Sequence, residues 1–153
     1  MKKILISLLA LGAAVAASGQ PLFERYKAQL TEPRSYDCFR TEGKMRIDGR
    51  LDEAAWRRAV PTAPFVDIRG EGYPEPVKKT SVRMLWDDRN LYIGAELEED
   101  DIVARLTQRD TIIYHDNDFE VFIDPDGDGQ HYFEIENNAR GVVFDLMLDK
   151  PYR

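Results

Sequence analysis

Hydrophobic and polar residues alternate along much of the chain between residues 80 and 149. The alternation is clearest in the segments 80–87, 91–99, 117–125, 130–137 and 141–149. A period of two is typical of strands that turn one face toward a core, and turn residues separate these segments. Short antiparallel strands at such intervals predict an all-β fold, namely an antiparallel, jelly-roll-like β-sandwich with one or two short helices.

The polar positions of the strands matter as much as the apolar ones. The turn residues at 87–90 join the first two segments into a predicted hairpin. Its apolar positions are expected on one face: Val82, Met84, Trp86, Leu91, Ile93, Ala95 and Leu97. On the third and fourth segments, apolar residues face one way (Phe119, Val121, Ile123, Phe133 and Ile135) and glutamates the other (Glu120, Glu134 and Glu136). A row of carboxylates is therefore predicted on one face of that hairpin.

Two segments have helical rather than alternating spacing. In the first, Asp52 can cap a short helix that turns Trp56 into the core. In the second, the apolar residues of 102–106 follow the acidic pair at 100–101 and predict one or two helical turns. Between residues 61 and 76 the prolines and glycines predict mostly loop, with an edge strand around residues 65–66.

The N-terminus has the pattern of a secretory signal. Lys2 and Lys3 precede the apolar run 4–15, and small residues follow, so residues 1–17 are expected to be a signal peptide. The run is shorter than the ~20 apolar residues of a membrane-spanning helix. The protein is thus expected to be exported, periplasmic or extracellular, without a membrane span. Residues 18–43 are expected to be an N-terminal extension, and 44–153 one domain that ends early at its C-terminal side.

The chain is acidic, with a formal charge of −7, and loss of the leader with its two lysines would make it −9. Nucleic acid is therefore not expected as a partner, because its phosphates would be repelled. Neutral ligands or divalent cations suit such a surface better.

The segment 124–129, Asp-Pro-Asp-Gly-Asp-Gly, has two interpretations, a calcium site or a hairpin turn. Asp124, Asp126 and Asp128 can supply several of the six to eight oxygens that Ca²⁺ requires. The spacing matches the first half of an EF-hand loop, but Ile135 stands where the bidentate glutamate belongs, and strands flank the loop. The alternative is a solvated hairpin turn, which glycine, proline and aspartate all favour.

The acidic strand residues also allow an enzymatic function. Asp118, Glu120, Glu134 and Glu136 can meet across neighbouring strands, and glycosidases use a carboxylate pair separated by either ~5 Å or ~6.5–9.5 Å. Acidic residues are abundant in this chain, however, so chance proximity is expected. No nucleophile elbow, zinc-protease helix or phosphate loop is present in the sequence. A glycoside hydrolase, or part of one, is the alternative to a non-catalytic function.

Several motifs resemble those of carbohydrate-binding module family 9. They are "IDGRLDEAAWRRA", "LWDDRNLYI", "DFEVFIDPDGDGQHYFEIENNARG" and "VVFDL", and the resemblance runs from about Lys44 to the C-terminus. It covers the N-terminal two thirds of that family's fold. It implies a β-sandwich that binds plant glucans or xylans without cleaving them, in support of polysaccharide breakdown, and that is stabilised by calcium.

The resemblance also implies a sugar site. The family clamps a sugar ring between two aromatic side chains, and Tyr114 matches the first of them, while the second belongs to a part absent from this sequence. Glu120 matches the glutamate of the central strand. Glu134 stands where the family has an arginine, and Arg109 can replace that arginine. The plainer alternatives are that Tyr114 packs against a loop, that Arg109 pairs with Asp110 to fix the loop, and that Glu120 is a solvated strand residue. At the level of the domain, the alternative is a calcium-stabilised structural or adhesion module.

Overall fold

The computed structural model describes residues 33–70 and 72–152, together with the isolated residues Glu24 and Lys27. The predicted signal peptide lies outside the described residues. Two three-stranded sheets form the fold, in the orders β1-β2-β3 and β4-β5-β6. The strands are β1 (Phe39–Arg40), β2 (Thr80–Trp86), β3 (Leu91–Leu97), β4 (Asp118–Ile123), β5 (Tyr132–Asn138) and β6 (Val143–Leu148). The all-β prediction is confirmed.

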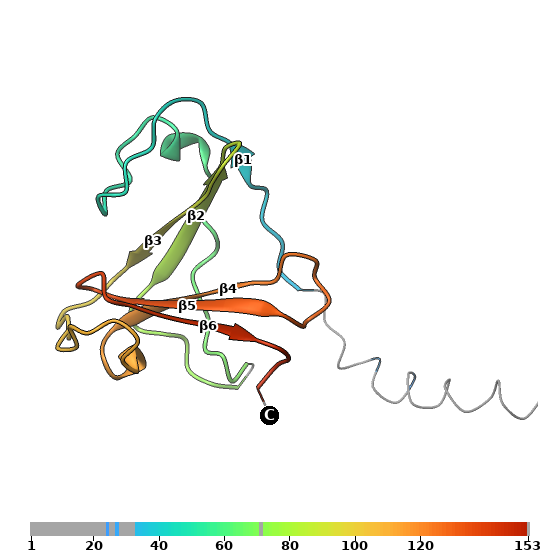
Figure 1. Ribbon diagram of the computed structural model, residues 1–153, viewed down its shortest axis with the longest axis vertical. Coiled ribbons are helices and arrows are strands. Elements are labelled where there is room, and N and C mark those ends of the chain that lie inside the picture. Colours follow the sequence, from blue (N-terminus) through green and yellow to red (C-terminus); the bar gives the residue numbers. More distant parts are fainter. Residues whose placement is uncertain (1–23, 25–26, 28–32, 71, 153) are drawn as a thin grey trace, which may run out of the picture.

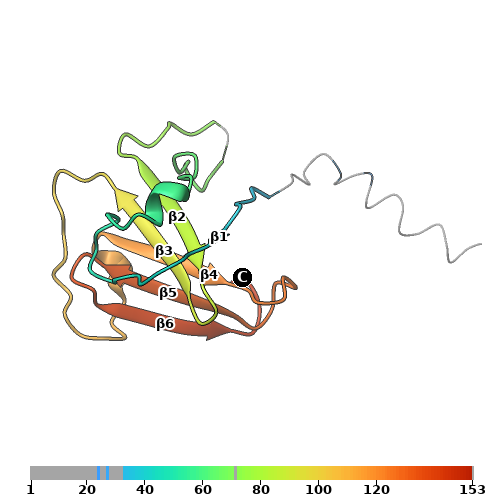
Figure 2. The same cartoon turned by 90° about the horizontal axis from the view of Figure 1, so that it is seen from above.

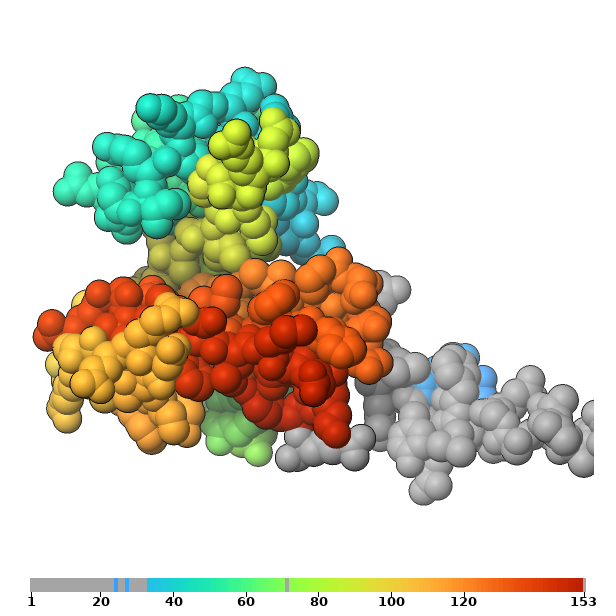
Figure 3. Space-filling model, in the orientation of Figure 1, coloured from blue at the N-terminus to red at the C-terminus, as the bar shows by residue number. Residues whose placement is uncertain are grey.

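The two sheets are stacked, and their strands cross in both ribbon views (Figures 1 and 2). All neighbouring strands are antiparallel except β1, which pairs with β2 in parallel. In the space-filling view the layer of β4, β5 and β6, in orange and red, lies below the β2–β3 hairpin and the cyan segment around residues 40–60 (Figure 3). Among the described residues, no helix is long and apolar enough to cross a membrane.

The register of β4 and β5 assigns their side chains to faces. Val121 pairs with Ile135, and Glu120 pairs with Glu136. Paired residues of an antiparallel ladder point to the same side, so the apolar pair and the acidic pair lie on opposite faces. Val121 and Ile135 line a cleft between the sheets together with Ile93 of β3. The glutamates therefore point away from the other sheet, on what is termed here the outer face.

A cluster of buried hydrophobic residues lies on the side of β2 and β3 that faces away from the second sheet. Leu85 is 1% exposed and packs with Trp56 and Ala59, as the sequence predicted for Trp56. Trp86 was expected in the core with Val82 but is 41% exposed. It lies at the end of β2, where its indole N–H donates to the carbonyl of Cys38 (3.2 Å). Both faces of the β2–β3 hairpin thus carry apolar side chains. The alternation of apolar and polar residues alone does not predict which face is more deeply buried by the rest of the chain.

The first predicted helix is the three-residue 3₁₀ turn η2 (Trp56–Arg58). Its N-cap is Ala55, without a side-chain cap. Asp52 is not the cap, because its carboxylate accepts a hydrogen bond from the guanidinium of Arg46 (2.9 Å).

The helix predicted at 102–106 does not form, and that prediction was wrong. The side chain of Asn117 accepts the backbone N–H of Val103 (2.7 Å), and the carboxylate of Asp116 accepts those of Arg105 (3.0 Å) and Leu106 (2.9 Å). These N–H groups are thereby satisfied by distant side chains rather than by a helical turn. The segment runs instead into a second 3₁₀ turn, η3 (Ile113–His115).

The edge strand predicted at residues 65–66 is also absent. The segment nevertheless follows β2, since the N–H groups of Thr62 and Phe65 donate to the carbonyls of Val82 and Thr80 (both 2.9 Å). Prolines at 61 and 64 have no N–H to donate, which limits the ladder to these two bonds.

The part of the N-terminal extension that the structure describes packs on the domain. It contributes β1, and the Tyr36 hydroxyl donates to the carbonyl of Val60 (2.6 Å) and accepts the N–H of Met84 (3.2 Å). Residues 36–40 therefore belong physically to the first sheet.

Candidate functional site

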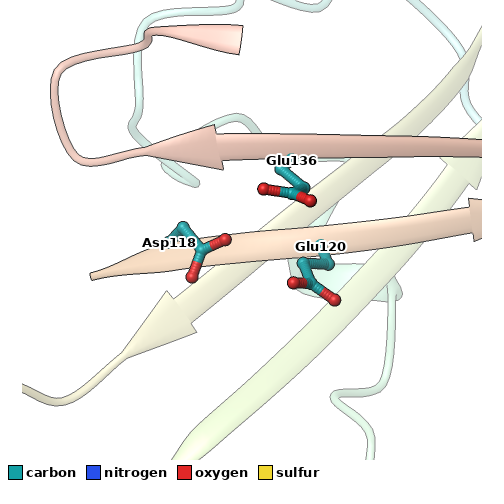
Figure 4. A group of neighbouring side chains, drawn as sticks. All are labelled: Asp118, Glu120 and Glu136. Carbon is teal, nitrogen blue, oxygen red and sulfur yellow. The ribbon is translucent and has the colours of Figure 1, made fainter. Parts of the chain in front are cut away.

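Three carboxylates meet on the outer face of the second sheet. Asp118 and Glu120 come from β4 and Glu136 from β5, and Figure 4 shows them gathered over the same stretch of the two strands. One oxygen from each lies within 4.8 Å of the others. This set is termed the acid cluster. The alternation of β4 places its first two members on one face, and the pairing of Glu120 with Glu136 adds the third.

The polar residues of β5 are unusually well buried. Glu134 is 5% exposed, Glu136 3% and Asn138 1%. Glu134 accepts a hydrogen bond from the hydroxyl of Tyr152 (2.5 Å). By contrast, Glu136 Oε2 and Asp118 Oδ2 are buried without a hydrogen-bond partner. Buried polar atoms usually have one, so the acid cluster is an exception that requires a physical reason.

The acid cluster carries concentrated negative charge. None of the ion pairs found within residues 33–70 and 72–152 involves its members or Glu134. Burial, followed by the negative charges of Glu120 and Asp118, raises the pKa of Glu136 to about 7. Burial likewise raises the pKa of Asp118 and of Glu120. Such a surface favours cations, protons or uncharged hydrogen-bond donors.

A loop braces one end of this face. The Asp116 carboxylate, which accepts the N–H groups of Arg105 and Leu106, also accepts the side-chain amide of Asn138 (2.9 Å). The same amide donates to the carbonyl of Leu106 (3.1 Å). The backbone bonds, followed by that of Asn138, hold the pKa of Asp116 below its usual range. The loop 103–117 is thereby fixed to the end of β5, and η3 contacts that strand.

Tyr114 lies on η3, beside a completely buried Ile113. The tyrosine is 57% exposed, and its ring centroid is 4.7 Å from that of His115. It therefore presents an accessible aromatic surface on an anchored element. Its predicted stacking role stays a prediction.

Arg109 lines a small hollow together with Glu134, and Glu120 is not part of that lining. The guanidinium of Arg109 donates to Asp145 and lies 3.7 Å from Asp110. Asp145 pairs with Ile135 in the register of β5 and β6, on the face opposite Glu134. The positive charge of Arg109 is thus already paired with Asp145. The predicted role of Arg109 toward a sugar stays a prediction.

The aspartates at 124, 126 and 128 lie in the loop between β4 and β5, as predicted. They are exposed, and one oxygen of each lies within 4.8 Å of the others, so this set can also hold a metal ion. The Asp124 carboxylate accepts the N–H groups of Gly127 (3.0 Å) and Gly129 (2.8 Å), which lowers its pKa. Both glycines have positive φ, 74° and 77°, as tight turns require. The loop is thus also a self-bonded hairpin turn.

The sequence predicted that Asp118, Glu120, Glu134 and Glu136 can meet across neighbouring strands, and the structure brings Asp118, Glu120 and Glu136 together. Of these four, only Glu120 and Glu134 had a predicted role in binding, and the sequence did not indicate Asp116 and Asn138 as a brace. The signal for Glu136 was present, since it alternates with Glu134 in the same strand. The brace left no local signal, because its two residues are far apart in the sequence.

Comparison with known proteins gives the family. Residues 47–146 match the model of the carbohydrate family 9 binding domain-like family. The chain is 27% identical over 99 residues to endo-1,4-beta-xylanase A of Thermoanaerobacterium saccharolyticum, and 27% identical over 101 residues to exoglucanase XynX of Acetivibrio thermocellus. Each match covers 65% of this chain and 8% of the relative.

No solved structure matches significantly. The matched family model spans most of the domain, and the chain therefore belongs to the carbohydrate family 9 binding domain-like family.

Proposed function

We propose that this domain binds oligosaccharides or polysaccharides of the plant glucan or xylan class, without cleaving them, on the outer face of β4, β5 and β6. The observation that carries the proposal is the exposed aromatic ring of Tyr114 on η3, an element that contacts β5, together with the carboxylates of β4 and β5. We further propose that the protein is exported and supports polysaccharide breakdown outside the cytoplasm.

The chemistry of the outer face suits a sugar. Carboxylates accept hydrogen bonds from hydroxyl groups, and Glu120 and Glu134 are held by the ladder of β4 and β5. The C–H face of a pyranose is apolar and stacks on an aromatic ring such as Tyr114 at little cost in conformational entropy. The two relatives carry the names of a xylanase and an exoglucanase, which supports this ligand class. Their activities belong to proteins of which this chain matches a small part.

Calorimetric titration with xylo- and cello-oligosaccharides tests the proposal. Tyr114→Ala is expected to weaken binding at least tenfold, about 1.4 kcal/mol, because the stacking surface is removed. Glu120→Gln is expected to weaken it as well, since a neutral amide accepts more weakly than a carboxylate. Tyr73→Ala is the matched control, because this exposed tyrosine lies over Arg69 in the loop before β2.

Two results would contradict the proposal. One is the absence of binding to any oligosaccharide tested, with and without calcium. The other is release of reducing sugar by the wild-type protein and its loss in Glu120→Gln, which would support a glycoside hydrolase instead.

Calcium at Asp124, Asp126 and Asp128 is proposed as a stabilising element of the same domain. An ion there would hold β4 and β5 in register at their connecting loop. The double variant Asp126→Asn/Asp128→Asn is expected to remove any calcium effect that originates in this loop. It leaves intact Asp124, on which the turn depends.

A further inference from the structure

The acid cluster has the dimensions of a cation site. Ca²⁺ binds oxygens at about 2.3–2.6 Å, so two oxygens on opposite sides of the ion are about 4.6–5.2 Å apart. The oxygens of Asp118, Glu120 and Glu136 lie within 4.8 Å of one another. These separations fall within the range found between oxygens that share one Ca²⁺ ion.

A second observation, independent of the charge count, points to a missing ligand. Glu136 is 3% exposed, its Oε2 has no hydrogen-bond partner, and its carboxylate faces Asp118 and Glu120 (Figure 4). Asp118 Oδ2 is buried and unpartnered too. An unsatisfied buried acceptor costs ~1–3 kcal/mol, and more if it is charged. Two such oxygens in one place are best explained by a group that binds both.

Another unpartnered carboxylate of this protein shows what the acid cluster lacks. Glu53 Oε2 is also buried without a hydrogen bond, but Glu53 Oε1 accepts from the guanidinium of Arg46 (3.2 Å). The charge of Glu53 is thereby compensated. Within the described ranges, no ion pair compensates the acid cluster.

We propose that Asp118, Glu120 and Glu136 bind a divalent cation of the calcium type. The cluster supplies only oxygen ligands, which hard cations prefer, whereas transition metals favour imidazole or thiolate. Three carboxylates provide part of the six to eight positions of Ca²⁺. Glu120 is exposed, so water has access to the remaining positions from that side.

The test is calcium binding to protein stripped with chelator, at constant ionic strength and without any sugar. Calorimetry is expected to show binding to the wild-type protein, and the melting temperature is expected to rise with calcium. Glu136→Gln and Asp118→Asn are expected to lose at least tenfold in affinity. Circular dichroism checks that they fold, which is expected because each removes one of the mutually repelling charges.

The double variant Asp118→Asn/Glu136→Gln is measured as well, and the loop variant Asp126→Asn/Asp128→Asn is its matched control because it removes the same number of acidic groups. The loop variant is expected to keep the calcium site of the acid cluster, which Glu136→Gln is expected to weaken. The proposal is overturned if the wild-type protein binds no calcium, or if binding persists in Glu136→Gln and disappears in the loop variant. Because no sugar is present, failure of the proposed carbohydrate binding would leave this result unchanged.

Discussion

At the scale of single residues, Gly94 shows how closely β3 approaches the segment that carries Trp56. A Cβ at position 94 would lie 2.6 Å from Cδ2 of Leu51 and 3.2 Å from Cη2 of Trp56. Both distances are shorter than ordinary van der Waals contacts. The glycine is therefore required by packing rather than by a positive φ.

Gly94→Ala is expected to destabilise the fold by about 1–3 kcal/mol, because the added methyl group displaces Leu51. In the Leu51→Ala background the same change should cost less, since the space is then free. Chemical denaturation of the four proteins of this double-mutant cycle measures both values. An equal cost of Gly94→Ala in both backgrounds would contradict the packing explanation.

At the scale of elements, the β2–β3 turn depends on one carboxylate. Asp87 accepts hydrogen bonds from the hydroxyl of Tyr92 (2.7 Å) and from the N–H groups of Arg89 and Asn90 (both 2.8 Å). The bond from Tyr92, followed by that from the Arg89 N–H, lowers the pKa of Asp87. The turn is thus closed by a charged acceptor.

Asp87→Ala is expected to lower the melting temperature at neutral pH. A carboxylate with a lowered pKa in the folded state contributes stability above its ordinary pKa of about 3.9, and this contribution is lost as the pH falls through the folded-state value. The difference between wild type and variant should therefore shrink on acidification below about pH 4. Melting curves from neutral to acidic pH measure it.

The matched control is Asp88→Ala at the next position. Asp88 forms one exposed ion pair with Arg40 (2.6 Å), and such pairs contribute little. A pH-independent effect of Asp87→Ala, or an equal effect of Asp88→Ala, would contradict the role of Asp87.

At the scale of the whole molecule, the β2–β3 hairpin separates two apolar layers that differ in how closely their side chains are packed. On one side, Leu85 is packed against Trp56 and Ala59. On the other, a cleft of about 700 Å³ lies between the sheets. Two of its lining residues, Leu97 and Ile102, are 47% and 65% exposed. The closely packed layer is therefore the one between the hairpin and the segment 45–59.

Leu85→Ala is expected to destabilise the domain by about 2–5 kcal/mol, as for a fully buried side chain. Ile93→Ala removes a similar volume from the wall of the cleft, where solvent already has access, and should cost clearly less. Denaturant unfolding compares the two. An equal or larger loss for Ile93→Ala would place the main core between the sheets instead.

The local pattern of the sequence determined much of this architecture. Alternation predicted all five long strands and put Glu120, Glu134 and Glu136 on one face, because neighbouring side chains of a strand point to opposite sides whatever surrounds them. The Asp124 loop was likewise predicted as a connection between two strands, since glycine and aspartate specify a turn locally.

Tertiary structure decided the rest. The residues 102–106 have helical spacing, but Asp116 and Asn117 bind their N–H groups and impose a loop. Burial of Glu136 and its approach to Asp118 depend on strand register and on what covers the outer face, which involve residues distant in sequence. The sequence by itself therefore determined which residues share a face. Only the folded chain decided which of them meet, which lose contact with water, and hence where charge is concentrated enough to bind a ligand.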